Sequence, residues 1–283
     1  MSIKAYCLSP GNHGFSNDKW DFGFLSEAFI KNKIEVIQSR SLPKDERAFV
    51  VVPGAEWSGQ EDKLSKELSK IDRIILFITA DEVGRLKVDE IHHDNIIIWV
   101  QYPYPRHKDY NKLPTGAPIH IHDLRPEYSK KEYEVYFAGQ ITHQRRTQLA
   151  ESIININGAE YNLTDGFAKG DDPKEYYKKL FLAKYAPAPA GAATIDSFRF
   201  YEALEMLCLP VADSISSVGE NYGFWELLFG SMPIEQTDDW NKLQSIVDSL
   251  NNDYPANLHR AVCWWIKYKR DFANKIMEQI NEH

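Results

Sequence analysis

The sequence has few cysteines and no long apolar run, and each absence excludes a class of protein. Its 283 residues include only three cysteines, Cys7, Cys208 and Cys263, and no Cys-x-x-Cys pair. Such an odd, scattered set is a poor disulfide framework and a poor zinc site, so we expect a reducing, cytoplasmic setting. Nowhere do eighteen uncharged apolar residues run together, and no basic region precedes an apolar stretch at the N-terminus. We therefore expect neither a membrane span nor a signal peptide.

Positive charge is also in the minority. Lys and Arg total 33 against 41 Asp and Glu, which gives a formal net charge of −8. This balance excludes an overall basic field that would attract nucleic acid or an anionic membrane. Basic groups gather only locally, at Arg106, Lys108, Lys112 and Arg125. What the chain does have is apolar material, with 43% hydrophobic and 13% aromatic residues, enough for a globular core.

Short apolar runs alternate with helix-compatible stretches along the chain, and this alternation predicts parallel sheets covered by helices. The runs form two series, with members at Ile3 to Leu8, Ile34 to Ile37, Ala48 to Val52, Ile74 to Thr79 and Ile96 to Val100, and then at Val135 to Ala138, Glu160 to Leu163, Tyr185 to Pro189 and Cys208 to Val211. We therefore predict an α/β protein with two Rossmann-like lobes, whose parallel sheets face a cleft.

A proline-rich segment separates the two series. Residues 101–126 contain five prolines, which are incompatible with a long helix. We interpret it as the crossing between lobes, with a short strand at Ile119 to His122. The predicted domains are an N-terminal Rossmann-like lobe over residues 1–125, a ligand-binding lobe over 126–255, and a C-terminal helix over 256–283 packed across both.

The most informative segment lies in the second lobe. A strand leads into the small residues of 190–193, Ala-Gly-Ala-Ala, and then into a helix. Small residues let a ligand approach the backbone, while the free amides and positive dipole of a helix start favour a diphosphate. Thr194 or Asp196 can cap that helix. Glu202, one turn further on, is suited to accept hydrogen bonds from both hydroxyls of a ribose.

This segment resembles a known family. The residues DSFRFYEALEMLCLPV, from Asp196 to Val211, are similar to the exostosin-type glycosyltransferase motif, and their Glu-Ala and Pro-Val parts to the broader GT-B superfamily. The resemblance implies a GT-B glycosyltransferase in which Glu202 binds the donor ribose. It also implies that Ser197 and Arg199 contact the donor.

A second stretch supports the resemblance. The residues YFAGQITHQRR, from Tyr136 to Arg146, resemble the family's Phe-x-Gly strand end at Gly139 followed by an arginine-bearing helix. The resemblance implies that Arg145 or Arg146 neutralises the leaving diphosphate, a role suited to a guanidinium without a metal. No Asp-x-Asp triplet occurs, which argues against a metal-dependent GT-A enzyme. We expect a UDP-linked sugar as donor substrate, and no cofactor.

Groups for acid–base chemistry or metal binding are less clearly marked. An inverting transfer needs a carboxylate or histidine near the acceptor hydroxyl, and the candidates in the first lobe are Asp81, Asp21 and His13. A retaining mechanism would need no such base. The pairs His92-His93 and His120-x-His122 have no Cys or acidic cluster beside them, so we expect no metal site.

The acceptor and the activity have alternatives. The acceptor is a glycan or a hydroxymethylated DNA base, and in the second case the basic residues of the crossing segment could contact DNA phosphate. The alternative to an enzyme is a non-catalytic nucleotide- or glycan-binding module that kept the GT-B fold. A nucleotide-sugar epimerase is a third reading, and the missing G-x-G-x-x-G after the first strand counts against it.

Overall fold

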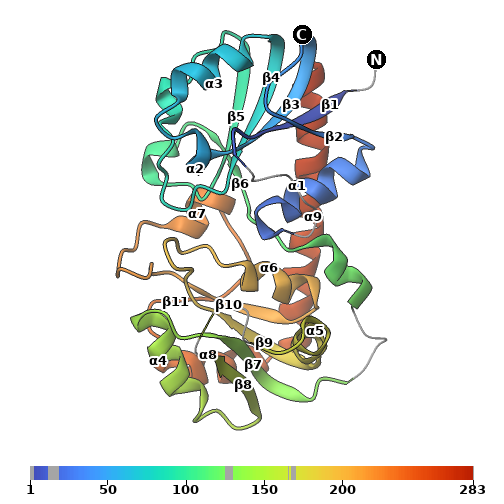
Figure 1. Cartoon of the computed structure of the whole chain (residues 1–283). Helices are drawn as coiled ribbons and strands as arrows, with labels where there is room; N and C mark the ends of the chain where they lie inside the picture. Colours follow the sequence, from blue (N-terminus) through green and yellow to red (C-terminus); the bar gives the residue numbers. More distant parts are fainter. Residues whose placement is uncertain (1–2, 12–18, 125–129, 165, 167–169, 283) are drawn as a thin grey trace. The chain divides into compact units, whose positions relative to one another are not determined.

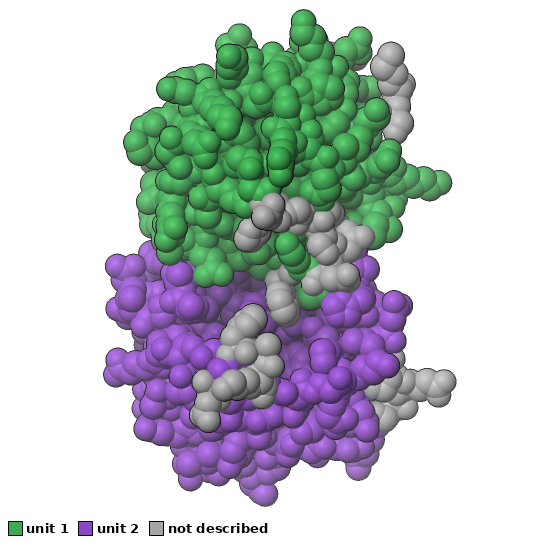
Figure 2. All heavy atoms as spheres, viewed as in Figure 1, with its two compact units in different colours: residues 1–118, 267–283 green, residues 119–266 purple. Residues whose placement is uncertain are grey.

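The computed structural model describes residues 3–11, 19–124, 130–164, 166 and 170–282, and these form two compact units. Unit 1 comprises residues 1–118 and 267–283, and unit 2 comprises residues 119–266 (Figure 2). Each unit is an α/β structure built on its own sheet.

Unit 1 holds a six-stranded parallel sheet in the order β2-β1-β3-β4-β5-β6 (Figure 1). Its strands are β1 (Lys4–Leu8), β2 (Val36–Ser39), β3 (Asp45–Pro53), β4 (Ile71–Thr79), β5 (Ile96–Gln101) and β6 (Asn111–Leu113). Its helical segments are α1 (Trp20–Lys31), α2 (Gly54–Trp57), α3 (Glu61–Leu68), η1 (Val88–Glu90) and η2 (Pro105–His107).

Both faces of this sheet are apolar because successive side chains of a strand point to opposite sides. On one face, Val50 and Leu76 belong to the same buried cluster as Leu64 of α3. On the other face, Phe77 packs against Phe29 of α1. This two-sided burial accounts for the near-continuous apolar runs of β3 and β4.

Unit 2 holds a five-stranded parallel sheet in the order β11-β10-β9-β7-β8. Its strands are β7 (Tyr133–Gln140), β8 (Ala159–Thr164), β9 (Ala183–Ala188), β10 (Leu209–Asp213) and β11 (Gln236–Thr237). Its helical segments are η3 (Ile119–Leu124), α4 (Gln144–Ile153), α5 (Pro173–Leu182), α6 (Phe198–Glu205), α7 (Phe224–Phe229), η4 (Trp240–Lys242) and α8 (Leu243–Asn251).

The last helix, α9 (Tyr254–Asn281), contributes residues to both units. Within unit 2, the indole of Trp265 donates to Glu205 Oε1 at 2.6 Å. Within unit 1, Phe272 packs edge-on against Trp99 of β5, with ring centroids 5.0 Å apart, and Gln279 accepts a hydrogen bond from the Trp99 indole. The aromatic residues of α9 therefore serve two separate cores.

The predicted architecture of two α/β lobes with parallel sheets and a C-terminal helix is confirmed, and one local prediction is wrong. Residues 119–124 form the 3₁₀ helix η3, where the alternation of Ile and His had predicted a strand. Among the described strands, none pairs with that segment, so its side-chain pattern does not become a strand. Among the described helices, none has the length and apolar content needed to cross a membrane.

Candidate functional site

The carboxyl edge of the unit 2 sheet has a topological switch point. From β7 the chain passes through α4 to β8 on one side, and later returns through α5 to β9 on the other side of β7. The connections that follow β7 and β9 therefore run to opposite sides of the switch point. In open α/β sheets, ligands bind in the crevice between two such connections. Gly139 and Gln140 end β7, and the small-residue loop 190–193 follows β9.

Arg146 lies at this switch point and bridges the two strand ends. Its Nη1 donates to the carbonyl of Gln140 at 3.0 Å, while its Nε and Nη2 both donate to the carbonyl of Ala190 at 3.3 Å. The residue is only 8% exposed. Both acceptors are neutral carbonyls, so these three hydrogen bonds do not neutralise the charge of the buried guanidinium.

Arg199, in the first turn of α6, brings a second cation to the same edge. Its Nε donates to the carbonyl of Ala138 at 3.0 Å, and its guanidinium lies over the ring of Phe137. Its buried Nη1 has no hydrogen-bond partner within the part of the chain that the structure describes. Burial, and then the charge of Arg199, lower the pKa of Arg146 to about 9. A pKa near 9 leaves Arg146 charged at neutral pH, and the guanidinium of Arg199 lies close enough to lower it.

Arg145, the neighbour of Arg146, is bound in a different way. Its Nη2 lies 2.6 Å from Oδ1 of Asp213, at the end of β10, and its Nε lies 3.2 Å from both oxygens. Asp213 is fully buried and also accepts from the amide of Ala190 and the indole of Trp240. The charge of Arg145 is therefore already balanced, and of the two adjacent arginines Arg146 is the one without an anion.

The start of α6 supplies further donors. Ser197 is its N-cap residue, is 3% exposed, and has an Oγ with no partner among the described residues. The sequence had suggested Thr194 or Asp196 as the cap, and the structure corrects this assignment: Thr194 Oγ1 instead accepts from the amide of Asp196. A Cβ on Gly191 would lie 2.8 Å from the carbonyl of Asp196, so the small-residue loop folds closely against this helix start.

Glu202 is buried one turn into α6, with 1% of its surface exposed. Its Oε2 accepts from the hydroxyl of Tyr176 and its Oε1 from that of Tyr177, both at 2.8 Å. Burial, and then the charge of Glu202, raise the pKa of both tyrosines. The carboxylate therefore does not face bulk water, and it is held by two neutral hydroxyl donors that its position in the sequence did not reveal.

Of the candidate acid–base residues of unit 1, Asp81 and Asp21 both accept hydrogen bonds from groups of the same unit. The two carboxylate oxygens of Asp81 accept from the amides of Arg85 and Leu86, at 2.8 and 2.9 Å, and these bonds fix the loop after β4. Asp21 accepts from the hydroxyl of Tyr102 at 2.8 Å. The third candidate, His13, lies outside the described residues.

Two other carboxylates of unit 1 escaped the sequence reasoning. Glu56, in α2, lies at the switch point between β1 and β3, where its Oε2 accepts from the hydroxyl of Ser9 and from the amide of Gly11. Desolvation, and then the charge of Asp21, raise the pKa of Glu82. The Pro53-Gly54 turn could have indicated Glu56 as a candidate. It marks the carboxyl end of β3, and residues just beyond the carboxyl ends of parallel strands lie at the ligand-binding edge of the sheet.

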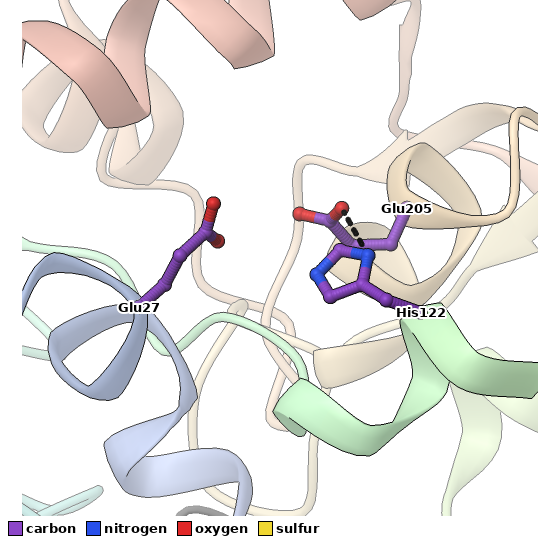
Figure 3. A group of neighbouring side chains, drawn as sticks. All are labelled: Glu27, His122 and Glu205. Carbon is purple, nitrogen blue, oxygen red and sulfur yellow. Dashed lines mark ion pairs between the residues drawn. The ribbon is translucent and has the colours of Figure 1, made fainter. Parts of the chain in front are cut away.

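His122 and two of the basic residues singled out in the sequence have partners within the described chain. His122 Nδ1 lies 3.6 Å from Glu205 Oε2, as the dashed line in Figure 3 marks. The figure also draws Glu27, a residue of unit 1. In the basic segment, Lys112 donates to the carbonyls of Lys108 and Tyr110, and Arg106 donates to the carbonyl of Gly84. Arg125 lies outside the described residues.

Comparison with known proteins finds similarity only among solved structures. No family model matches the chain, and no curated protein matches it. An α1,3-fucosyltransferase is similar with a TM-score of 0.49 and 10% identity, over 91% of this chain and 81% of the other. AviGT4, a glycosyltransferase involved in avilamycin A biosynthesis, is similar with a TM-score of 0.43 and 10% identity, over 96% of this chain and 98% of the other.

What the unit 2 site can bind follows from its own residues. Two guanidiniums, a buried hydroxyl and two helix starts converge on one sheet edge without a carboxylate to balance Arg146 or Arg199 among the described residues. Guanidiniums and free helix amides are the groups that bind phosphate oxygens. The chemistry of this edge is therefore that of an anion site, with a carboxylate, Glu202, one helical turn away.

Proposed function

We propose that this chain is a GT-B glycosyltransferase that binds a nucleotide-diphosphate sugar, UDP-linked, at the switch point of unit 2. The proposal rests mainly on Arg146 and Arg199. Within the described residues, the guanidiniums of both form hydrogen bonds to main-chain carbonyls and to no carboxylate. Keeping two cations together costs free energy in the unliganded protein. The negative charge of a bound diphosphate would offset that cost, and we propose that this is why the two guanidiniums lie together.

The proposed chemistry needs a group that stabilises the leaving diphosphate. In the transfer, the bond between the sugar's anomeric carbon and the diphosphate oxygen breaks, and an acceptor oxygen forms the new bond to that carbon. The nucleoside diphosphate then leaves with added negative charge. Fixed guanidiniums and the amides at the start of α6 can take up that charge without a metal ion, so we propose a metal-independent enzyme with no cofactor.

The nucleoside end is assigned to Glu202. A carboxylate offers about four lone-pair sites, and the hydroxyls of Tyr176 and Tyr177 use one on each oxygen. We propose that the two oxygens also accept hydrogen bonds from the two hydroxyls of a ribose. We propose that the tyrosines hold the carboxylate ionised and oriented for this purpose.

The acceptor side is assigned to unit 1. If the transfer inverts the anomeric configuration, the acceptor hydroxyl must lose its proton to a base, for which Asp81, Asp21 and His13 remain the proposed candidates. We propose a glycan acceptor. A DNA acceptor is less well supported, because the net charge is −8 and the described basic residues Arg106 and Lys112 donate to carbonyls of their own chain.

Glu202→Gln tests the ribose assignment together with the donor. Calorimetry with UDP-, GDP- and ADP-linked sugars should find binding strongest for a UDP sugar. The substitution keeps the size of the side chain but removes its charge, so affinity should fall by about 1.5–3 kcal/mol, roughly 10- to 100-fold. Glu151→Gln, at an exposed position of α4, is the matched control and should bind normally.

Three results would change the proposal. Unaltered UDP-sugar affinity in the Glu202→Gln variant would remove the ribose assignment. Failure of every nucleotide sugar to bind the wild-type chain would contradict the proposed glycosyltransferase activity. Tight binding without release of nucleoside diphosphate, for any glycan acceptor or for water, would identify a non-catalytic binding module instead.

Gly139→Ala tests whether Arg199 contacts the donor. A Cβ at this position would lie 2.4 Å from Nη2 and 3.0 Å from Cζ of Arg199. The end of a flexible side chain has to move, so the fold should persist while the guanidinium is displaced. We expect UDP-sugar affinity to fall roughly tenfold, about 1.4 kcal/mol, with little change in melting temperature. Gly170→Ala, where a Cβ meets open space, should change neither quantity; equal affinities in the two variants would argue against a role for Arg199.

A further inference from the structure

His143, the N-cap residue of α4, lies at the same edge as Arg146. Its Nε2 lies 3.1 Å from the carbonyl oxygen of Ala190. A carbonyl only accepts hydrogen bonds, so Nε2 carries a proton in this contact. In the neutral ring Nδ1 is then an acceptor with a free lone pair, and it is buried without a partner in the described part of the chain.

The carbonyl of Ala190 has more donors around it than it can satisfy. It faces His143 Nε2 and both Nε and Nη2 of Arg146, at 3.1, 3.3 and 3.3 Å. A carbonyl oxygen has two lone pairs. Three donors on one neutral acceptor leave the site short of acceptors, which an anion with several oxygens would correct.

Burial, and then the charge of Arg146, favour the neutral form of His143 in the unliganded protein. Burial lowers its pKa most, followed by the positive charge of Arg146, and Arg145 adds to the effect. The carbonyl of Ala190 and the carboxylate of Asp213 act in the opposite direction, and the shift remains downward. An imidazole in this position is therefore set to gain a proton when a negative charge arrives.

We infer that His143 is a further anion-binding residue of this site, and that it takes up a proton when a phosphate or sulfate oxyanion binds beside Arg146. The inference rests on the proposed function only for the natural identity of that oxyanion. Protonation turns Nδ1 from an acceptor into a charged donor. A protonated His143 then offers the ligand one more charge-assisted hydrogen bond.

The sign of the pH dependence follows from linkage. The ligand's negative charge raises the pKa of His143, so the bound state holds more protons than the free state between the two pKa values. Affinity therefore rises as pH falls through the pKa of the complex. It becomes level once pH is below the pKa of the free protein, where both states are protonated.

Histidine NMR on the full chain tests the inference. Long-range ¹H–¹⁵N spectra recorded against pH give the tautomer and titration midpoint of each histidine, and the His143→Gln variant identifies the resonance of His143. We expect the free ring to be neutral at pH 7 with its proton on Nε2. Sulfate, which does not itself titrate near neutral pH, should raise the midpoint by about one pH unit or more at constant ionic strength, and UDP-glucose should do the same.

The other histidines are the internal control, and the exposed His259 in particular should not move. A His143 midpoint unaffected by both ligands, or a free ring that is already charged at pH 7, would overturn the inference. A shift with sulfate but none with UDP-glucose would support the anion site and contradict the proposed nucleotide sugar. A shift with both would support both.

Discussion

Replacing Arg145 with methionine is expected to lower the free energy of unfolding by about 3–5 kcal/mol, the usual cost of removing one partner from a buried ion pair. The reason is Asp213, which is fully buried and would lose three contacts to the guanidinium, of which the shortest is 2.6 Å. The amide of Ala190 and the indole of Trp240 would remain, and they cannot balance a full charge. Urea unfolding of the purified variant measures the loss.

A double variant separates the ion pair from simple packing. Combining Arg145→Met with Asp213→Asn removes both charges, so the double variant should be more stable than the sum of the two single losses predicts. If Arg145→Met unfolds at the same urea concentration as the wild type, the pair is not structural. The assignment of Arg145 to the protein and Arg146 to the ligand would then fail.

Replacing Arg146 with methionine is expected to leave stability nearly intact and to abolish most of the binding. The substitution removes contacts to two neutral carbonyls but also ends the repulsion from Arg199. These effects oppose each other, so the free energy of unfolding should change by about 1 kcal/mol or less. The diphosphate loses a buried charged donor, which costs about 2–5 kcal/mol, or roughly 30- to 4,000-fold in the dissociation constant of a UDP sugar.

The two variants form a matched pair, because the same substitution is made at adjacent positions of one helix. Calorimetry with UDP-glucose and urea unfolding should be performed on both. Stability should depend on Arg145 and binding on Arg146. A variant at position 146 that binds with wild-type affinity would show that the anion does not lie between β7 and β9.

Much of the fold could be predicted because central strands such as β3, β4 and β5 are buried along most of their length. Residues 74–79 and 96–100 read as continuous apolar runs and lie within β4 and β5. Elements with little burial gave no such signal: β6 and β11 span three and two residues. The Ile-His-Ile-His alternation at 119–122 shows the opposite error, since a local pattern becomes a strand only where a sheet offers it a partner.

The candidate site could be predicted as far as neighbouring strand ends allow. Gly139 lies at the end of β7 and Arg146 follows that strand, while Ser197 and Arg199 follow β9, so adjacent parallel strands bring them to one edge. Which of the two arginines is neutralised depends on Asp213, 68 residues away in the sequence. The tyrosine partners of Glu202 and the role of His143 likewise depend on contacts that no local spacing encodes.

The interrupted sequence of unit 1 also has a consequence for synthesis. Its sheet is complete by residue 118, yet Phe272 and Gln279, which cover Trp99, are made only at the end of the chain. Unit 2 is continuous in sequence and can fold while unit 1 still exposes apolar surface to solvent or to chaperones. During synthesis, unit 2 can therefore complete its fold before unit 1, although most of unit 1 is made first.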